Sequence, residues 1–460
     1  MPAVSQPSGF GSFQDNPASM ALVNESYFSA SLSTRYVNER STFLGNEDSF
    51  SDNQTGLGDV GFVYKVPTVR GSLVVGGGYS QSTDFNGTFN NSGYNSNSTI
   101  TDLYARFPKS VGLNEAAYNT FAIEDVNSDS STSIFRFGNN FSYYPGINQN
   151  VEFVEKGVRG EYSFFIASEV LKNVFLGGSI GYSRGTYSSK REFLESDQRN
   201  NYDGQFIDVD GDGQFETDID RILSVQTIET ELQSFQARVG IVYKPNETLN
   251  VGVSYILPSV TYIDEKYSTT LTTSFDDGSK SETVEATGNF YYDKPYRVNE
   301  AASVSNIYRP ARLKGGVTVA PSDELSISVA ADFVRHSNTE IEFEKKAHNI
   351  EENRTNSLIK STFKDIVNLR AGLEYNVNEQ LTPRVGYSFM PSPRNGLKGD
   401  RQFINGGFTA ELTKGLLFDL GAQYSFWEED TVLYETSRVK AVINEDVRRV
   451  HVMAGIRMAL

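Results

Sequence analysis

The sequence contains no cysteine, a single tryptophan and only three histidines among its 460 residues. The lack of cysteine excludes disulfides, thiolate metal sites and cysteine nucleophiles. The histidines, His336, His348 and His451, have neither the spacing of metal ligands nor a neighbouring catalytic set. No apolar run approaches the roughly 18–20 residues that a membrane-spanning helix requires. The absences therefore point away from a helical membrane protein and from most enzymes.

The charge balance and the aromatic content narrow the class further. Lys and Arg number 41 against 58 Asp and Glu, which gives a formal net charge of -17. Such an acidic surface repels phosphate backbones, so we expect no nucleic-acid partner. The 25 Tyr and 31 Phe residues suit half-buried strands and membrane interfaces, although only 38% of the residues are hydrophobic.

Hydrophobic residues recur at every second position along much of the chain. From Leu416 to Phe426, and again from Val450 to Leu460, one face is apolar and the other is mostly polar or small. This period predicts β-strands. Alternation alone fits two architectures: a soluble sandwich with one face in water, or a membrane barrel with the apolar face in lipid.

The lengths of the connections favour the barrel. We predict strands at 26–38, 57–66, 71–82, 156–170, 173–187, 231–244, 247–260, 309–320, 323–337, 364–376, 380–389, 400–413, 415–428 and 446–460. Tight turns alternate with longer polar loops, of which 83–155, 188–230 and 261–308 are the longest. Short periplasmic turns and long extracellular loops are typical of outer-membrane barrels. The sequence therefore predicts an all-β protein, a 14-stranded antiparallel transmembrane β-barrel in a bacterial outer membrane.

The N-terminal segment, residues 1–25, precedes the first strand of the barrel, which we place at 26–460. A lumen of fourteen strands is too wide for side chains alone to fill, so we expect this segment to enter it as a short hatch. The segment has no signal-peptide core; if the protein is exported, its signal has been removed from the sequence shown.

Several hairpins and one short motif resemble those of the FadL family of outer-membrane transporters. The hairpins are 236–255, 310–329 and 369–388, and the motif is Asn16-Pro17-Ala18. The stretch 42–46 looks like members from Bacteroidota. The resemblance covers nearly the whole chain, but the hatch is shorter than in relatives and the last residue is Leu rather than Phe.

The resemblance implies a monomeric channel, not an enzyme, for passive uptake of long-chain fatty acids and other hydrophobic compounds. It implies that the hatch at Asn16, Pro17 and Ala18 moves, and that a kink in the third strand opens a lateral exit into the outer-membrane lipid. Glycines weaken strands, so Gly76, Gly77 and Gly78 could permit that kink or could only make room for the hatch. The alternative function is a barrel that transports nothing and serves secretion or surface assembly; a soluble adhesin is a third reading.

The loop at 83–155 contains apolar residues that need an explanation on an extracellular surface. We predict that they receive a hydrophobic ligand, with two basic residues for a ligand carboxylate. The predicted ligand-binding residues are Leu103, Tyr104, Phe107, Leu113, Tyr118, Phe121, Arg106 and Lys109. The alternative is that these side chains pack among themselves.

An acidic stretch in the loop at 188–230 resembles a calcium-binding loop. Carboxylates at positions 1, 3 and 5 and a glycine at position 6 are the pattern that wraps Ca²⁺ in EF-hand loops. The twelfth position is Ile219, so a neighbouring aspartate would replace the usual carboxylate. We predict a structural Ca²⁺ held by Asp208, Asp210, Asp212, Gln214, Asp218 and Asp220, the alternative being a solvated acidic loop.

Two glycine motifs mimic enzyme signatures. Gly177–Gly181 matches a nucleophile elbow and Gly56–Gly61 a dinucleotide fingerprint. Both lie within predicted strands and neither is followed by the helix that those functions require. We therefore predict no catalytic residues.

Overall fold

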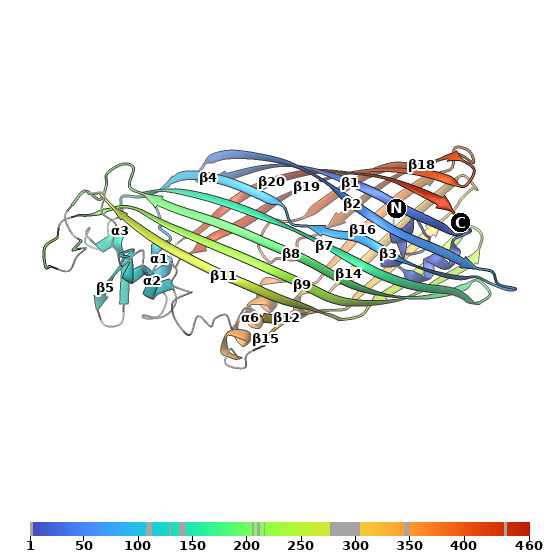
Figure 1. Ribbon diagram of the computed structural model, residues 1–460, viewed down its shortest axis with the longest axis horizontal. Coiled ribbons are helices and arrows are strands. Elements are labelled where there is room, and N and C mark those ends of the chain that lie inside the picture. The colour runs from blue at the N-terminus through green and yellow to red at the C-terminus, as the bar shows by residue number, and fades with distance from the viewer. Residues whose placement is uncertain are drawn as a thin grey trace.

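The structure is a computed structural model that describes residues 3–106, 113–127, 130–137, 144–204, 207–208, 212–215, 217–276, 304–344, 349–436 and 439–460. Its main element is one antiparallel sheet that closes on itself, because β1 pairs with β20 as well as with β2. Figure 1 shows the resulting barrel from the side.

The sheet contains eighteen strand segments. They are β1 (Tyr27–Phe43), β2 (Asn46–Val66), β3 (Leu73–Asp84), β4 (Gly87–Asn95), β7 (Ile147–Leu171), β8 (Val174–Ser196), β9 (Ile219–Asn246), β10 (Leu249–Ile256), β11 (Ser259–Phe275), β12 (Val304–Arg309), β13 (Arg312–Val319), β14 (Leu325–Val334), β15 (Glu340–Phe343), β16 (Ile366–Tyr375), β17 (Leu381–Met390), β18 (Arg401–Thr413), β19 (Leu416–Glu435) and β20 (Lys440–Ala459). Four barrel strands are each interrupted once: β3/β4, β10/β11, β12/β13 and β14/β15. The barrel therefore has fourteen strands, as the sequence predicts.

Proline explains two of the interruptions. Pro258 lies between β10 and β11, and Pro310 lies between β12 and β13. Proline has no backbone N–H to donate to the ladder, so a strand breaks or bends where it occurs.

The outer face of the barrel carries a belt of exposed apolar and aromatic side chains. Along β7, for example, Tyr162, Phe164 and Ile166 are between 47% and 60% exposed, while the inward-facing Phe165 is fully buried. Aromatic members of the belt on other strands are Phe28, Tyr36, Phe62, Tyr64, Phe235, Tyr243, Tyr255, Tyr262, Tyr308, Phe333, Tyr375, Tyr387 and Tyr424. Such a belt is what a strand needs to face hydrocarbon and its interfaces.

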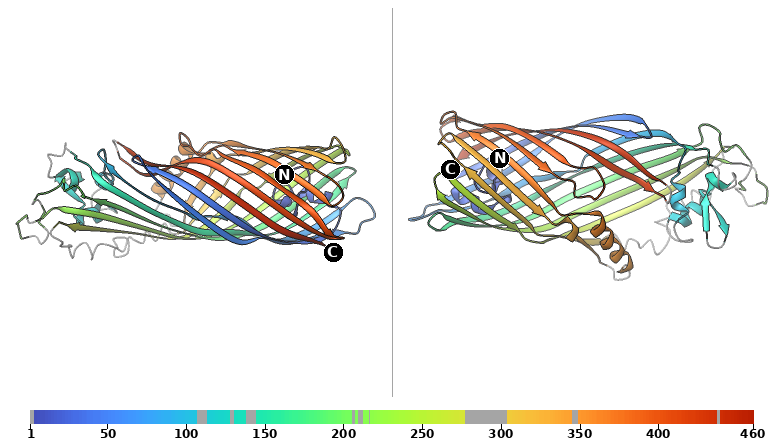
Figure 2. Two further views of the ribbon diagram at one scale, coloured as in Figure 1. Left: turned by 90° about the horizontal axis from the view of Figure 1, so that it is seen from above. Right: turned by 180° about the vertical axis from the view of Figure 1, so that it is seen from behind.

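The two ends of the barrel differ. Both termini lie at the end that carries the tight turns (Figures 1 and 2). The other end carries α1 (Thr101–Tyr104), α2 (Leu113–Asn119), α3 (Ile134–Phe137) and the hairpin of β5 (Ile123–Asn127) and β6 (Ser130–Ser133). We call these elements the cap. None of the helices in the described ranges is long and apolar enough to cross a membrane.

Several strands extend further toward the cap than the sequence predicts. The predicted loop at 39–56 is a paired hairpin of β1 and β2 that turns at Leu44-Gly45, where both residues have positive φ. The polar stretch 429–445 likewise belongs mostly to β19 and β20. The outer face of these extensions lies beyond the apolar belt, and the inner face buries polar residues such as Glu39 and Ser41 beside Phe43, so they lack the apolar alternation that marks the rest of the barrel.

One helix was not predicted. The structure forms α6 (Asn349–Thr362) in the connection between β15 and β16, and it projects from the side of the barrel (Figure 2). Its sequence, Asn-Ile-Glu-Glu-Asn-Arg-Thr-Asn-Ser-Leu-Ile-Lys-Ser-Thr, is polar on nearly every side, so it gives no amphipathic signal.

Candidate functional site

The N-terminal segment lies inside the barrel as two short 3₁₀ helices, η1 (Phe10–Gln14) and η2 (Pro17–Leu22). Asn16 caps η2, since its side-chain oxygen accepts a hydrogen bond of 3.0 Å from the Ala18 N–H, and Pro17 occupies the first position, where no N–H is needed. We call residues 3–24 the hatch.

Asn16 also anchors the hatch to the barrel wall. Its Nδ2 donates to the carbonyl of Val4 at 2.6 Å and to the carbonyl of Ile241 on β9 at 3.2 Å. The side chain is fully buried, and a Cβ atom at Gly240 would overlap it. The predicted Asn16-Pro17-Ala18 motif is therefore the place where the hatch meets the wall.

A buried charge cluster provides a second anchor. The carboxylate of Asp15 accepts hydrogen bonds from Lys314 Nζ at 2.6 Å and from Arg370 Nη1 at 2.8 Å. The side chain of Lys314 is only 7% exposed, so its charge depends on this partner. Lys314 and Arg370 were not predicted as site residues, because other inward-facing positions of the same strands, such as Arg312 and Glu374, are charged as well.

The predicted glycines of β3 lie beside the hatch. Gly76, Gly77 and Gly78 pair with β2 on one side and with β7 on the other, so the ladder is continuous there. A Cβ at Gly78 would come within 2.8 Å of the Phe10 ring of the hatch, and one at Gly76 within 2.6 Å of the Phe165 ring. At these positions glycine allows close packing, and the wall itself is intact.

The ladder between β2 and β3 ends a little further along. Its last pair is Asp59 with Ser80, and no further pair joins the two strands among the described residues, although both continue. The register of β2 shifts at Gly58 against β1, and that of β3 shifts at Ser82 against β7. Such bulges bend strands away from their neighbours. We call residues 56–58 and 81–83 the window.

Side-chain contacts link the two edges beyond the window. Asn86 donates a side-chain hydrogen bond to Gln54, and Asn46 Nδ2 donates to the carbonyl of Ser92 at 2.7 Å. Among the described residues no backbone pair joins β2 to β4, so these side chains hold the edges together where the ladder has ended.

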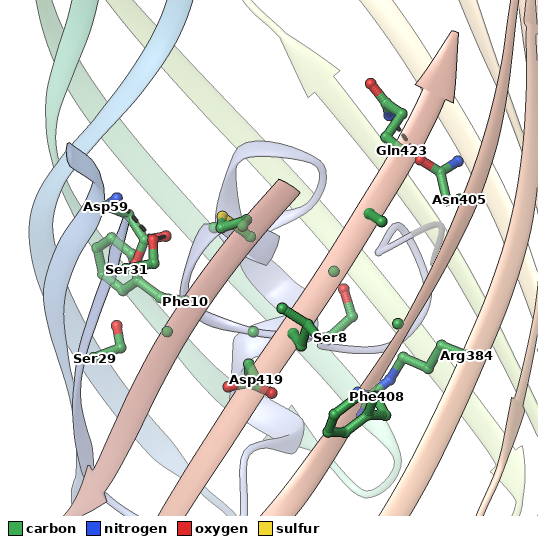
Figure 3. A pocket seen from close by; sticks show the side chains of 18 of the residues that line it. Ser8, Phe10, Ser29, Ser31, Asp59, Arg384, Asn405, Phe408, Asp419 and Gln423 are labelled. Carbon is green, nitrogen blue, oxygen red and sulfur yellow. Dashed lines mark hydrogen bonds between the residues drawn. The ribbon is translucent and has the colours of Figure 1, made fainter. Parts of the chain in front are cut away.

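Two cavities of the lumen connect the hatch with the window. The first, of about 460 Å³, is lined by the hatch at Ser8–Ser12 and by inward side chains of β1 and β17–β20 (Figure 3). The second, of about 470 Å³, is lined by Gly56, Gly58 and residues 80–83. They share the lining residues Gly11, Asp59, Gln423, His451 and Met453.

The second cavity contains the single tryptophan between two arginines. The guanidinium carbons of Arg401 and Arg449 lie 4.7 Å and 4.8 Å from the Trp427 ring centroid. The indole Nε1 donates to Glu429 at 3.2 Å, which also pairs with Arg394 at 2.6 Å. Trp427 is 6% exposed, so charge comes to this lining from the arginines, and apolar contact comes from Phe403 and Met453. The combination suits a ligand that has both polar and apolar parts. The sequence offered one signal for it, a lone Trp at an inward position.

The predicted ligand-binding residues of the cap lie mostly within its own core. Tyr104 is 2% exposed, and Leu103 and Phe121 pack against the same cluster of buried side chains. Tyr118 is 45% exposed. Arg106 donates to the carbonyl of Glu435 at 3.4 Å. Of the rest, Phe107 and Lys109 lie outside the described residues, and Leu113 begins α2.

A buried polar network holds the cap to the barrel. Glu195, at the cap end of β8 and well beyond the apolar belt, is fully buried and accepts hydrogen bonds from Gln149 Nε2 at 2.6 Å and from the Ile100 N–H at 2.9 Å. Burial raises the pKa of Glu195 to about 7. Nearby, Asp102 and Arg136 form a bidentate ion pair at 2.6 Å.

The predicted calcium loop is only partly described. The N–H of Gly213, which has φ +88°, donates to Asp208 at 2.8 Å, and the N–H of Gln214 donates to Asp212 at 2.8 Å. Asp210 lies outside the described residues.

The other two predicted ligands are turned to other partners. Asp220 accepts from Arg221 Nε at 2.9 Å, and Asp218 accepts from the Gly204 N–H. Within the described ranges, no three Asp, Glu, His or Cys side chains are close enough together to hold a metal ion.

A closed antiparallel barrel with an apolar outer belt, an internal hatch and a lumen beside an interrupted wall defines an outer-membrane channel. The family model for "Outer membrane protein transport protein (OMPP1/FadL/TodX)" matches residues 161–455, more than half of the chain. The chain therefore belongs to the FadL/TodX family of outer-membrane transport channels for hydrophobic compounds, which are not enzymes.

Solved structures share the fold of this chain. A FadL homologue of Pseudomonas aeruginosa has a TM-score of 0.56 at 12% identity, covering 100% of this chain and 96% of that one. The Pseudomonas putida toluene transporter TodX has a TM-score of 0.50 at 12% identity, covering 100% and 95%. No curated protein matches the chain.

Proposed function

We propose that this chain takes up hydrophobic compounds that carry a polar group, such as long-chain fatty acids, and releases them sideways through the window into the outer membrane. The compound enters from the cap side, passes the cavity beside Trp427, and leaves the lumen between β2 and β3. No energy source is required, since the compound moves down its own gradient.

The observation that carries this proposal is the end of the β2–β3 ladder at Asp59–Ser80, beside a cavity that both strand edges line. Unpaired strand edges facing lipid are unfavourable, because their backbone groups lose hydrogen bonds. An interruption maintained at this position by two bulges is consistent with a functional opening.

Lateral release follows from the solubility of the cargo. An alkyl chain gains about 0.8 kcal/mol for each CH₂ that moves from water into hydrocarbon. The hatch narrows the periplasmic route: it packs through Phe13 onto Phe165 with ring centroids 5.0 Å apart, and the cavity left beside it, of about 230 Å³, is half the size of the one beside the window. The membrane is therefore the favourable destination for the apolar part.

The charged lining favours a transported compound with a polar end and disfavours a hydrocarbon without polar atoms. Arg35, Arg401, Arg449, His451 and Asp59 all line the second cavity. A compound without polar atoms would displace water from these groups without replacing its hydrogen bonds. A carboxylate or hydroxyl end compensates for that loss.

A cross-link across the window tests the proposal. The chain has no cysteine of its own, so only the introduced cysteines can react. A Cβ at Gly56 would lie 3.4 Å from Oε1 at the end of the Gln81 side chain, so the pair Gly56→Cys and Gln81→Cys suits a short bifunctional linker that reduction cleaves. We expect uptake of labelled oleate by a host without its own such channel to stop when the link forms and to return on reduction.

The matched control is Thr34→Cys with Thr55→Cys, which joins β1 to β2 at a point where the hydroxyls are 2.9 Å apart. This link leaves the window open, and uptake should continue. Undiminished uptake with the window linked would refute lateral exit.

The second candidate is a barrel for secretion or surface assembly. The charged side chains in the lining of both cavities and the firmly anchored hatch favour it, because a passage without charged groups is the simpler device for hydrophobic cargo. This function predicts that no labelled fatty acid enters through either the linked or the unlinked protein.

A further inference from the structure

Two aspartates meet at the cap end of the β9–β11 ladder. The last register pair of these strands is Phe275 with Ile219, and Asp276 and Asp218 are the next residue on each side. The backbone N–H of Asp276 donates to the Asp218 carbonyl at 3.1 Å, so the two residues are held opposite each other. Like charges directly opposite on paired strands destabilise the sheet.

Asp218 has little access to water that would screen its charge. The residue is 4% exposed, and its Oδ2 accepts a hydrogen bond from the Gly204 N–H. Its other oxygen, Oδ1, receives no hydrogen bond from any of the described residues. A buried carboxylate oxygen without a donor is costly, on the order of 1–3 kcal/mol or more.

The carboxyl groups around that oxygen are acidic. Asp276 interacts directly with the Asp218 side chain, and Asp203 adds a further negative charge nearby. Burial, followed by these neighbours, raises the pKa of Asp218 to about 7. Two carboxylates in contact require either a shared proton or a cation between them.

We propose that Asp218 and Asp276 bind a divalent cation, Ca²⁺ in the extracellular medium, which joins the loop that follows β8 to the end of β11. Hard oxygen ligands suit Ca²⁺, and water and backbone carbonyls complete its shell in many extracellular sites. The site consists of Asp218, which belongs to the predicted calcium loop, and Asp276, which lies outside it. The proposal does not depend on the transport function.

Mutations can distinguish this site from the calcium loop predicted from the sequence. Asp212, on the predicted loop, accepts a hydrogen bond from the Gln214 N–H and is not among the residues that contact Asp218. Asp276→Asn alters an exposed side chain and is expected to fold normally, whereas Asp218→Asn changes a buried one. Asp212→Asn is the matched control on the predicted loop.

The experiment follows hydrogen exchange of segments 197–204 and 271–276 in the detergent-purified full chain, titrated with CaCl₂ after removal of metal by EDTA. We expect Ca²⁺ to protect both segments with half-saturation on the order of 10⁻⁴–10⁻³ M. Asp276→Asn and Asp218→Asn should each raise the half-saturating Ca²⁺ concentration by about tenfold or more, while Asp212→Asn leaves that concentration unchanged.

Two outcomes would overturn the proposal. If Asp212→Asn abolishes the effect and Asp276→Asn does not, the cation belongs to the 208–214 loop. If Ca²⁺ changes nothing in the unmodified chain while a pH drop from 8 to 5 protects both segments, the two aspartates share a proton.

Discussion

The hatch and the cap lie at opposite ends of the barrel and differ in the charges that hold them. The hatch packs on the wall through an apolar cluster that includes Phe13 and Phe165, and a buried ion cluster of Asp15 with Lys314 and Arg370 ties it to two further strands. The cap is built around a larger apolar cluster that includes Phe135, and the carboxyl at its edge, Glu195, accepts hydrogen bonds from neutral donors. Docking of the hatch therefore depends in part on buried full charges, whereas the cap depends mainly on packing.

The largest effect should come from the cap core. Phe135 is 1% exposed and its ring centroid lies 5.0 Å from that of Tyr202. Phe135→Ala should lower the free energy of local unfolding of the cap by about 3–5 kcal/mol, because it removes a buried ring and leaves a cavity. Native-state hydrogen exchange of the cap peptides measures this; exchange of the hatch should not change, and parallel loosening of both would contradict their independence.

A smaller loss should follow from one hatch anchor. Asp15→Asn leaves the buried Lys314 without a carboxylate, which should weaken docking of the hatch by about 3 kcal/mol. Limited proteolysis within residues 3–24 reports it. Asp446→Asn is the control, since its partner Arg448 is 57% exposed and water screens the pair, so its loss should leave protease sensitivity unchanged. Equal protease sensitivity of the two variants would show that the ion cluster does not hold the hatch.

The smallest effect concerns pH and again separates the two ends. The pKa of Glu195 is raised from 4.5 to about 7, so the protonated form is favoured in the folded cap. The stability it contributes is complete below pH 4.5 and is lost as pH rises through about 7, a change of about 1–3 kcal/mol. The protection of residues 98–104 against hydrogen exchange, corrected for the pH dependence of intrinsic exchange, should fall from pH 5 to pH 8. Glu195→Gln should remove this fall in protection. A wild-type profile that matches the variant would rule out the buried charge as its cause.

The barrel is predictable from the sequence because lipid on one side of a strand forces every second residue to be apolar, as in 416–426 and 450–460. The strand count and the side of the tight turns follow from the same pattern. Prediction fails where that force ends. The β1–β2 extension near Leu44 buries polar residues on its inner face, and α6 is polar on nearly every side, so neither carries a periodic apolar signal.

The site is less predictable, because its residues come together only in three dimensions. The motif identifies Asn16, but Asp15 carries no sign of its partners, which lie 299 and 355 residues away on β13 and β16. The window shows the same limit. The run Gly76–Gly78 attracts attention as a weak strand, whereas the ladder ends beside the bulges at Gly58 and Ser82.

Photo-crosslinking with a diazirine-bearing long-chain fatty acid tests the central claim most directly. Irradiation of the protein in lipid bilayers, followed by peptide mapping, should place adducts on the facing edges at residues 54–59 and 80–83 and on the cavity beside Trp427. Adducts confined to the cap, or to the hatch end at residues 3–24 with both edges unlabelled, would contradict a sideways exit between β2 and β3.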